Sequence, residues 1–194
     1  MWGGREFLSS VSTHAYDEMK VNSAVEIVDV AENPEYERFL YRCLFHSRGA
    51  VYKKLFRSRR DSFYKKRQEY LQSAIPKGFH KKILFFKGDQ VGTIEYALAE
   101  GSGLPIMGDN VIVMNCIWVQ RRAKGHNFGK RLLENMIESE KGVSGFATIA
   151  LENYWGGYFK RRDMESLGFK SVKSIRVRHK TKNRKRCFNV HLMW

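Results

Sequence analysis

The chain has 194 residues, of which 43% are hydrophobic and 13% aromatic. This composition suits one domain with a packed core and is unlike that of a disordered chain. Lys and Arg number 35 against 20 Asp and Glu, and the net charge of +15 predicts attraction to anionic ligands or polyanions without specifying a fold. No apolar run reaches the ~18 residues of a membrane span, and the first residues lack the apolar segment of a secretory signal, so we expect no membrane association.

The three cysteines, Cys43, Cys116 and Cys187, lie far apart in the sequence. They form no CxxC pair, and no histidines accompany them at metal-ligand spacing, so the sequence predicts no metal site. Unpaired cysteines of this kind favour a reducing compartment over a disulfide scaffold. We therefore expect a cytoplasmic protein.

The first half of the chain reads as an extension, a strand, two helical segments and a hairpin. Residues 1–22 show no firm period and are expected to precede a single domain at 23–194. The Asn33-Pro34 pair is typical of a helix start, and Phe56, Phe63 and Tyr70 share one helix face through their seven-residue spacing. The predicted elements are a strand at 24–31, a helix from 34 to about 45, a second helix at 50–73, and a hairpin at 81–100 that turns at 88–90.

The second half of the chain contains two apolar runs typical of buried strands. The predicted elements are a loop at 101–110, strands at 111–119 and 145–151, a helix at 158–167, and strands at 169–177 and 187–194. The two buried strands bracket one helix, which predicts a βαβ unit with parallel neighbours. The fold class is therefore α/β or α+β, in one domain with a mixed sheet.

The segment VQRRAKGHNFGKRLLENMI, residues 119–137, joins the end of a buried strand to a basic, glycine-bearing loop and an amphipathic helix. Free backbone N–H groups at a helix start, aided by the helix dipole, bind phosphates. The glycine spacing differs from both the dinucleotide fingerprint and the Walker A loop. The loop is thus a candidate phosphate site of another kind.

These residues resemble the GNAT superfamily of N-acetyltransferases. In that superfamily a buried strand ending in Val is followed, after about four residues, by [QR]-x-x-[GA]-x-[GA] at the start of a Leu-rich helix. Counting from Val119 places the hexapeptide on residues 124–129, with Lys124 in place of Arg or Gln and Asn127 in place of Gly or Ala. The superfamily's later pattern, an Asn at the next strand end and an [FL]-G-F turn, matches Asn153 and residues 167–169.

The resemblance implies a mixed, mostly antiparallel sheet whose central parallel strands splay around the cofactor, with helices on both faces. It implies an acetyl-CoA-dependent N-acetyltransferase in which a primary amine attacks the thioester directly in a ternary complex. Backbone groups of three strand residues would bind the pantetheine arm, the loop would hold the pyrophosphate, and the asparagine after the next strand would also contact the cofactor. The implied cofactor-binding residues are Ile117, Trp118, Val119, Lys124, Gly125, His126, Asn127, Phe128, Gly129, Lys130 and Asn153.

The catalytic residues are less directly implied. The superfamily's usual acid is a Tyr at the position that Met164 occupies, so Tyr158 or Tyr154 would replace it, and we predict Tyr158. The strand before the loop carries no carboxylate, and Glu95 in the preceding hairpin is the candidate base, acting directly or through water. The alternative for Glu95 is an exposed, salt-bridged residue.

Two other functions stay open at this point. The basic stretch at 173–186 has no acidic residue, which suits a protein that binds RNA or another polyanion. A degenerate GNAT fold that binds CoA without transferring anything is the other, because Met164 and Asn127 depart from the pattern. The acceptor is expected to be a small-molecule, peptide or other amine. The sequence leaves open whether the chain forms a homodimer.

Overall fold

The computed structural model describes residues 25–41, 57–178 and 187–194, with side chains from residue 65 onward in the second range. The predicted extension at 1–22, parts of both predicted early helices (42–45 and 50–56) and the basic turn at 179–186 lie outside these residues. Those expectations therefore stay predictions.

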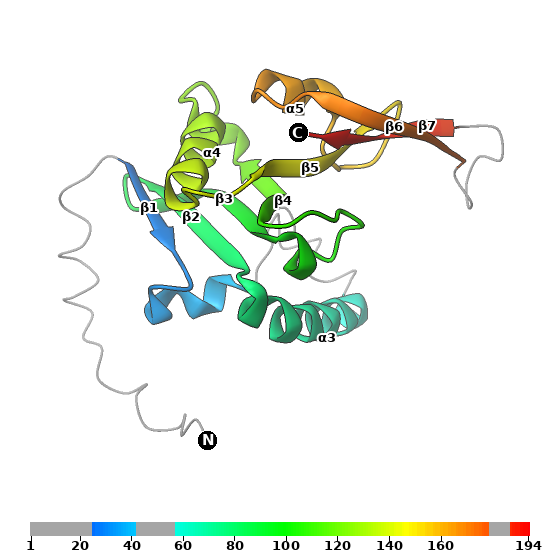
Figure 1. Cartoon of the computed structure of the whole chain (residues 1–194). Helices are drawn as coiled ribbons and strands as arrows, with labels where there is room; N and C mark the ends of the chain where they lie inside the picture. The colour runs from blue at the N-terminus through cyan, green and yellow to red at the C-terminus, as the bar shows by residue number, and fades with distance from the viewer. Residues whose placement is uncertain (1–24, 42–56, 179–186) are drawn as a thin grey trace.

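A mixed sheet forms the centre of the described fold (Figure 1). Its order is β1-β2-β3-β4-β5-β7-β6, and every neighbouring pair is antiparallel except β4 and β5. This confirms the predicted mixed sheet and its central parallel pair. The strands are β1 (Val25–Asp29), β2 (His80–Phe86), β3 (Asp89–Leu98), β4 (Val111–Val119), β5 (Gly145–Glu152), β6 (Ser171–Arg178) and β7 (Cys187–Met193).

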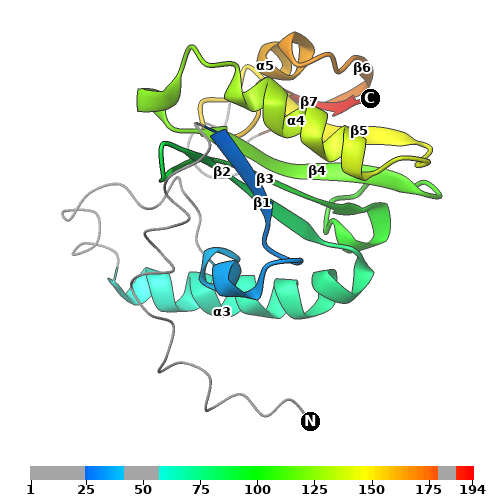
Figure 2. The same cartoon turned by 90° about the vertical axis from the view of Figure 1, so that its left-hand side faces the viewer.

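Helices cover both faces of the sheet, as predicted. Figures 1 and 2 show α3 (Arg57–Ala74) and the 3-10 helix η1 (Pro34–Phe39) on one face, and α4 (Phe128–Ser139) and α5 (Arg161–Ser166) on the other. We call these the α3 face and the α4 face. Three further 3-10 turns connect elements: η3 (Ile75–Lys77), η4 (Ala99–Gly101) and η5 (Arg121–Ala123).

Each face has its own hydrophobic core. On the α4 face, Leu132 and Met136 are fully buried against sheet residues such as Ile94 and Met114. Their i, i+4 spacing gives α4 the apolar stripe that the sequence predicted. On the α3 face the corresponding cluster includes Leu71, Ala74, Phe79, Ile83 and Ala97. The α4 core holds the helix that begins at the candidate phosphate loop.

Three predicted boundaries are wrong, and the other element ends within the described residues shift by at most two residues. The hairpin turns at Lys87-Gly88 and not at 88–90: both residues have positive φ (52° and 78°), as a two-residue turn matched to strand twist requires, so Asp89 already belongs to β3. The first helix is a 3-10 helix that ends at Phe39. The last helix begins at Arg161 and not at Tyr158, because the preceding chain is extended beside β5, where the Leu151 N–H donates to the Phe159 carbonyl over 2.8 Å.

Candidate active site

The parallel strands β4 and β5 pair over only three positions. The last pair is Val113 with Ala147, yet β4 continues to Val119 and β5 to Glu152. Beyond that pair the two strands diverge, while β4 keeps its partner β3 on the other side. We call the resulting separation the wedge. The strand pairing between β4 and β5 therefore ends at Val113, as the predicted splay requires.

Thr148 lies at the apex of the wedge. Its side chain is fully buried, and Oγ1 donates a hydrogen bond of 2.7 Å to the Met114 carbonyl. A side-chain hydroxyl thus hydrogen-bonds the backbone carbonyl at the first position where strand-to-strand pairing has ended. This contact helps to define where the strands separate.

A bulge lies one residue further along β4. Tyr96 of β3 pairs with Met114 and Glu95 pairs with Cys116, so Asn115 is an extra residue on β4. A bulge inserts one residue and changes which face the following side chains occupy. Cys116 therefore shares the face of Glu95, which is the α3 face.

The candidate phosphate loop has the backbone of an anion site. Gly125 (φ 90°) and Asn127 (φ 56°) both adopt left-handed conformations, and Asn127 is the N-cap of α4 without a side-chain capping bond. The helix bonding begins with Arg131 N–H to the Asn127 carbonyl, which leaves the N–H groups of residues 128–130 without intrahelical acceptors. Asparagine tolerates this conformation better than most residues, so the departure at Asn127 does not prevent the loop from forming.

Space is also available at the loop. A Cβ added at Gly125 or Gly129 would meet no atom within 4 Å. The unbonded N–H groups and the open space lie at the same helix start. The residues present therefore fit the diphosphate of a nucleotide cofactor.

Contacts with the β2–β3 hairpin hold the loop in place. The Gln120 N–H donates to the Val91 carbonyl over 2.8 Å, and Arg122 pairs with Asp89 at 3.0 Å. The His126 ring stacks on Phe128 with centroids 5.1 Å apart and lies 5.0 Å from the Phe86 ring. The His126 side chain is thus packed on rings of the loop and hairpin, although it stays exposed.

The predicted acid, Tyr158, lies in the loop between β5 and α5. Tyr158 is 38% exposed, and the partial burial of its phenol raises the pKa of Tyr158, with the nearby Cys116 raising it further. The effect of Cys116, a β4 residue, places the phenol within electrostatic range of the strand across the wedge. Met164, at the superfamily's tyrosine position, is 3% exposed and belongs to the α4-face core. Of the two residues, only Tyr158 carries a proton that could be donated.

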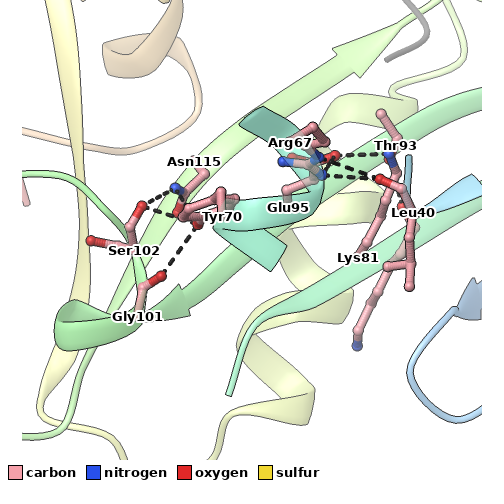
Figure 3. A network of polar contacts seen from close by, with 10 residues as sticks. Leu40, Arg67, Tyr70, Lys81, Thr93, Glu95, Gly101, Ser102 and Asn115 are labelled. Atoms are coloured by element: carbon pink, nitrogen blue, oxygen red, sulfur yellow. Dashed lines mark hydrogen bonds and ion pairs between the residues drawn. The ribbon is translucent and has the colours of Figure 1, made fainter. Parts of the chain in front are cut away.

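Glu95 is buried and ion-paired, not exposed. Its Oε1 lies 2.8 Å from both Nη2 of Arg67 and Nζ of Lys81, and Lys81 is 1% exposed (Figure 3). Arg67 also donates to the Leu40 carbonyl at 3.2 Å. Because Oε1 is engaged by two cations, base catalysis at Glu95 would use the other oxygen, Oε2.

A second polar group adjoins this ion cluster on the α3 face (Figure 3). Tyr70 Oη lies 3.2 Å from the Gly101 carbonyl and 3.1 Å from the Ser102 carbonyl. Asn115 Nδ2 donates to the same Ser102 carbonyl and, over 3.3 Å, to Tyr70 Oη. Polar side chains thus fill part of the layer between α3 and the sheet, beside the wedge.

The carboxyl end of β5 is fixed by Glu152. Its carboxylate accepts from Asn189 over 2.8 Å and from Arg161 over 3.2 Å. The hydrogen bond from Asn189 and the charge of Arg161 lower the pKa of Glu152. Glu152 thereby ties β7 and α5 to the strand end that precedes Asn153, which has φ 61°.

The predicted cofactor residues thus lie along the wedge or on the segments that directly follow its two strands. Ile117, Trp118 and Val119 form the last part of β4 along the wedge, residues 124–130 follow at the start of α4, and Asn153 follows β5. The sequence did not identify Thr148, Arg67, Lys81 or Tyr70 as site residues. The sequence indicates only Tyr70, through its place on one face of the predicted helix. The other three residues act through contacts between segments that are distant in the sequence, which no local pattern records.

Two kinds of feature are not found in the described part of the chain. It holds no group of three or more His, Cys, Asp or Glu residues that could bind a metal ion. None of its helices is both long and apolar enough to cross a membrane.

No protein-family model matches the sequence. One curated relative, the uncharacterized N-acetyltransferase YoaP of Bacillus subtilis (strain 168), is 33% identical over 78 residues, which cover 39% of this chain and 31% of the relative. The match thus spans about a third of that protein's length.

Solved structures resemble most of the chain. A putative GNAT-family acetyltransferase from Desulfovibrio desulfuricans superposes with a TM-score of 0.55 at 15% identity, covering 88% of this chain and 97% of that one. For aminoglycoside 6'-acetyltransferase type Ii the TM-score is 0.51 at 14% identity, over 88% and 95%. For AAC(6')-Iy, in complex with the bisubstrate analogue CoA-S-monomethyl-acetylneamine, it is 0.50 at 17% identity, over 85% and 100%. The chain therefore has the fold of the GNAT acetyltransferases.

Proposed function

We propose that the protein is an acetyl-CoA-dependent N-acetyltransferase that acts on a primary amine. The observation that carries this proposal is the coincidence of two features on one β-loop-α segment. The strand β4 separates from β5 after Val113, and eight residues after the strand ends at Val119 the chain reaches Asn127, the N-cap of α4, which makes no side-chain capping bond. The partial match to YoaP and the acetyltransferase folds support it.

The cofactor would be held mainly by backbone groups. The N–H groups at the start of α4 would bind the pyrophosphate, with Lys124 and Lys130 adding positive charge. Backbone groups of residues 117–119, on the part of β4 that lies beyond its pairing with β5, would hydrogen-bond the amides of the pantetheine arm. Asn153, at the end of β5, would complete the opposite side of the wedge. The bound acetyl-CoA supplies an activated acyl group with a thiolate leaving group.

The transfer would need two proton movements. The amine nitrogen forms a bond to the thioester carbonyl carbon, and the C–S bond breaks. We assign Tyr158 as the group that protonates the departing sulfur, because a phenol is protonated at neutral pH and Tyr158 lies within electrostatic range of Cys116 on β4. We assign Glu95 Oε2 as the acceptor of the amine's proton, directly or through a water molecule. The protein's remaining contribution is to hold the two reactants in register.

The acceptor is a small-molecule, peptide or other amine. The analogue bound to AAC(6')-Iy is named as a CoA-linked neamine, and an amine acceptor is the counterpart that we propose here. The chain's net charge of +15 favours acceptors that also carry acidic or phosphate groups.

A thiol-release assay tests the proposal. The protein is incubated with acetyl-CoA and, in turn, with polyamines, peptides and aminoacyl compounds, and free CoA is measured with a thiol reagent. We expect saturable, amine-dependent release with at least one compound class. Tight acetyl-CoA binding without release by any amine would contradict the proposal and favour a degenerate fold that only binds CoA.

A further inference from the structure

Three buried side-chain atoms in the described residues lack a hydrogen-bond partner: Tyr96 Oη, His191 Nε2 and Asn115 Oδ1. Two of them have a carboxylate close by. His191 Nε2 lies 3.6 Å from Glu152 Oε2, and burial together with the charge of Glu140 raises the pKa of Tyr96. Asn115 Oδ1 has no such neighbour in the described structure. A buried carbonyl oxygen without a donor is costly, so this atom needs an explanation.

The orientation of the Asn115 amide is fixed by its neighbours. Nδ2 donates to the Ser102 carbonyl and to Tyr70 Oη. Exchanging nitrogen and oxygen would place Oδ1 against the Ser102 carbonyl, and two acceptors cannot bond to each other. The oxygen is therefore held in place by a network that leaves its own lone pairs unused (Figure 3).

The position of Asn115 relates it to the reaction. It is the bulge residue of β4, two residues beyond the last pair between β4 and β5, so it lies where the strands have already diverged. Its side chain lies on the α3 face, against Tyr70 of α3. The phosphate loop leads into α4 on the opposite face. A cofactor anchored from the α4 side leaves the α3 side for the second reactant.

We propose that Asn115 positions the acceptor amine by accepting a hydrogen bond from the attacking nitrogen at Oδ1. This inference rests on the proposed N-acetyltransferase function. An amine nucleophile carries N–H donors and must direct its lone pair at the thioester carbon, so an acceptor at a fixed place sets its orientation. An amide neither takes nor gives a proton at neutral pH, so Asn115 is a positioning residue, and the proton still leaves through the base.

The test uses hydroxylamine, a small nucleophile that needs no matched acceptor pocket. CoA release from acetyl-CoA is followed at increasing hydroxylamine, and acetyl-CoA affinity is measured separately by calorimetry. In Asn115→Ala we expect kcat/KM for hydroxylamine to fall by roughly 10²-fold, the scale of a misplaced reactant. The Kd for acetyl-CoA should stay within about threefold, because the cofactor contacts lie elsewhere.

Two further variants separate positioning from stability. Tyr96→Phe removes another buried oxygen without a partner, on the α4 face, and should leave the hydroxylamine rate within about threefold of wild type. Asn115→Leu, of similar size and shape but without an acceptor oxygen, should be as impaired as Asn115→Ala, because the acceptor is lost while the volume is kept.

The outcomes distinguish the two proposals. A wild-type protein that releases no CoA above the uncatalysed rate contradicts the proposed function itself. An active wild type with an equally active Asn115→Ala, or an Asn115→Leu that retains clearly more of the rate than the alanine variant, overturns only the role of Asn115.

Discussion

Replacing Thr148 by valine tests whether the hydroxyl at the apex sets the opening between β4 and β5. Valine has nearly the same shape, so Thr148→Val leaves no cavity but removes the 2.7 Å hydrogen bond to the Met114 carbonyl at a fully buried site. A buried acceptor left without its donor costs about 1–3 kcal/mol. For a chain of this size, each kcal/mol lowers the melting temperature by roughly 2–4 °C. Without this bond the two strands are also less firmly held at the apex, which would change the width of the wedge. We therefore expect acetyl-CoA binding to weaken by about tenfold, the equivalent of one such bond.

Thr93→Val is the matched control for this experiment. Thr93 is also buried, and its Oγ1 donates to the Lys82 carbonyl over 3.0 Å, between β3 and β2 and away from the wedge. Urea unfolding should show a similar loss of stability in both variants, while calorimetry should show weaker acetyl-CoA binding in Thr148→Val alone. Equal affinities in the two variants, or an unfolding free energy of Thr148→Val within about 0.5 kcal/mol of wild type, would show that the Thr148 hydroxyl does not set the opening.

Three other predictions concern single groups. Tyr158→Phe should lower turnover by roughly 10²–10⁴-fold with little change in acetyl-CoA affinity, and a rate within threefold of wild type would exclude Tyr158 as the acid. Glu95→Gln leaves the buried Lys81 and the partly buried Arg67 without their carboxylate and should lower the unfolding free energy by about 3–5 kcal/mol in urea denaturation; a stable variant would show that the ion cluster is dispensable. The hydrogen bond to Asp29 raises the pKa of His80 above the ordinary value of about 6.5. Its stabilisation is therefore full below about pH 6.5 and is lost as pH rises through the folded pKa, so the stability gap between wild type and Asp29→Asn should shrink over that range, and a constant gap would contradict the assignment.

Much of the fold could be predicted because its signals are local. Residues 111–119 are almost continuously apolar, and the structure forms β4 over the same residues. The apolar stripe of residues 128–137 likewise predicts α4. In the structure the buried residues of this stripe pack against the sheet. Boundaries were less reliable, because they depend on contacts made elsewhere. The start of α5 is delayed by pairing of Phe159 with β5, which no local pattern records.

The candidate site likewise has one part that local sequence predicts and another part that depends on tertiary contacts. The phosphate loop could be predicted because its residues are consecutive and a helix start follows from sequence spacing. The departure at Asn127 is accommodated by a left-handed backbone that asparagine tolerates. The polar layer of Arg67, Lys81 and Glu95 could not be predicted, because it joins α3, β2 and β3 through side chains whose pairing only tertiary structure decides. For the same reason the sequence leaves an exposed, salt-bridged Glu95 as an alternative, whereas the residue is buried.

The most direct test of the proposed function is calorimetry of acetyl-CoA with wild type and Gly129→Asp. The added side chain points into open space, so the variant should fold with an unchanged melting temperature. Its carboxylate would stand beside the free N–H groups at the start of α4, where it repels the pyrophosphate and competes for the same donors. The uncharged Gly129→Asn, of equal size, should lose less affinity. We predict measurable binding by wild type and none by Gly129→Asp. A folded Gly129→Asp that binds acetyl-CoA as tightly as wild type would show that the start of α4 does not bind the pyrophosphate.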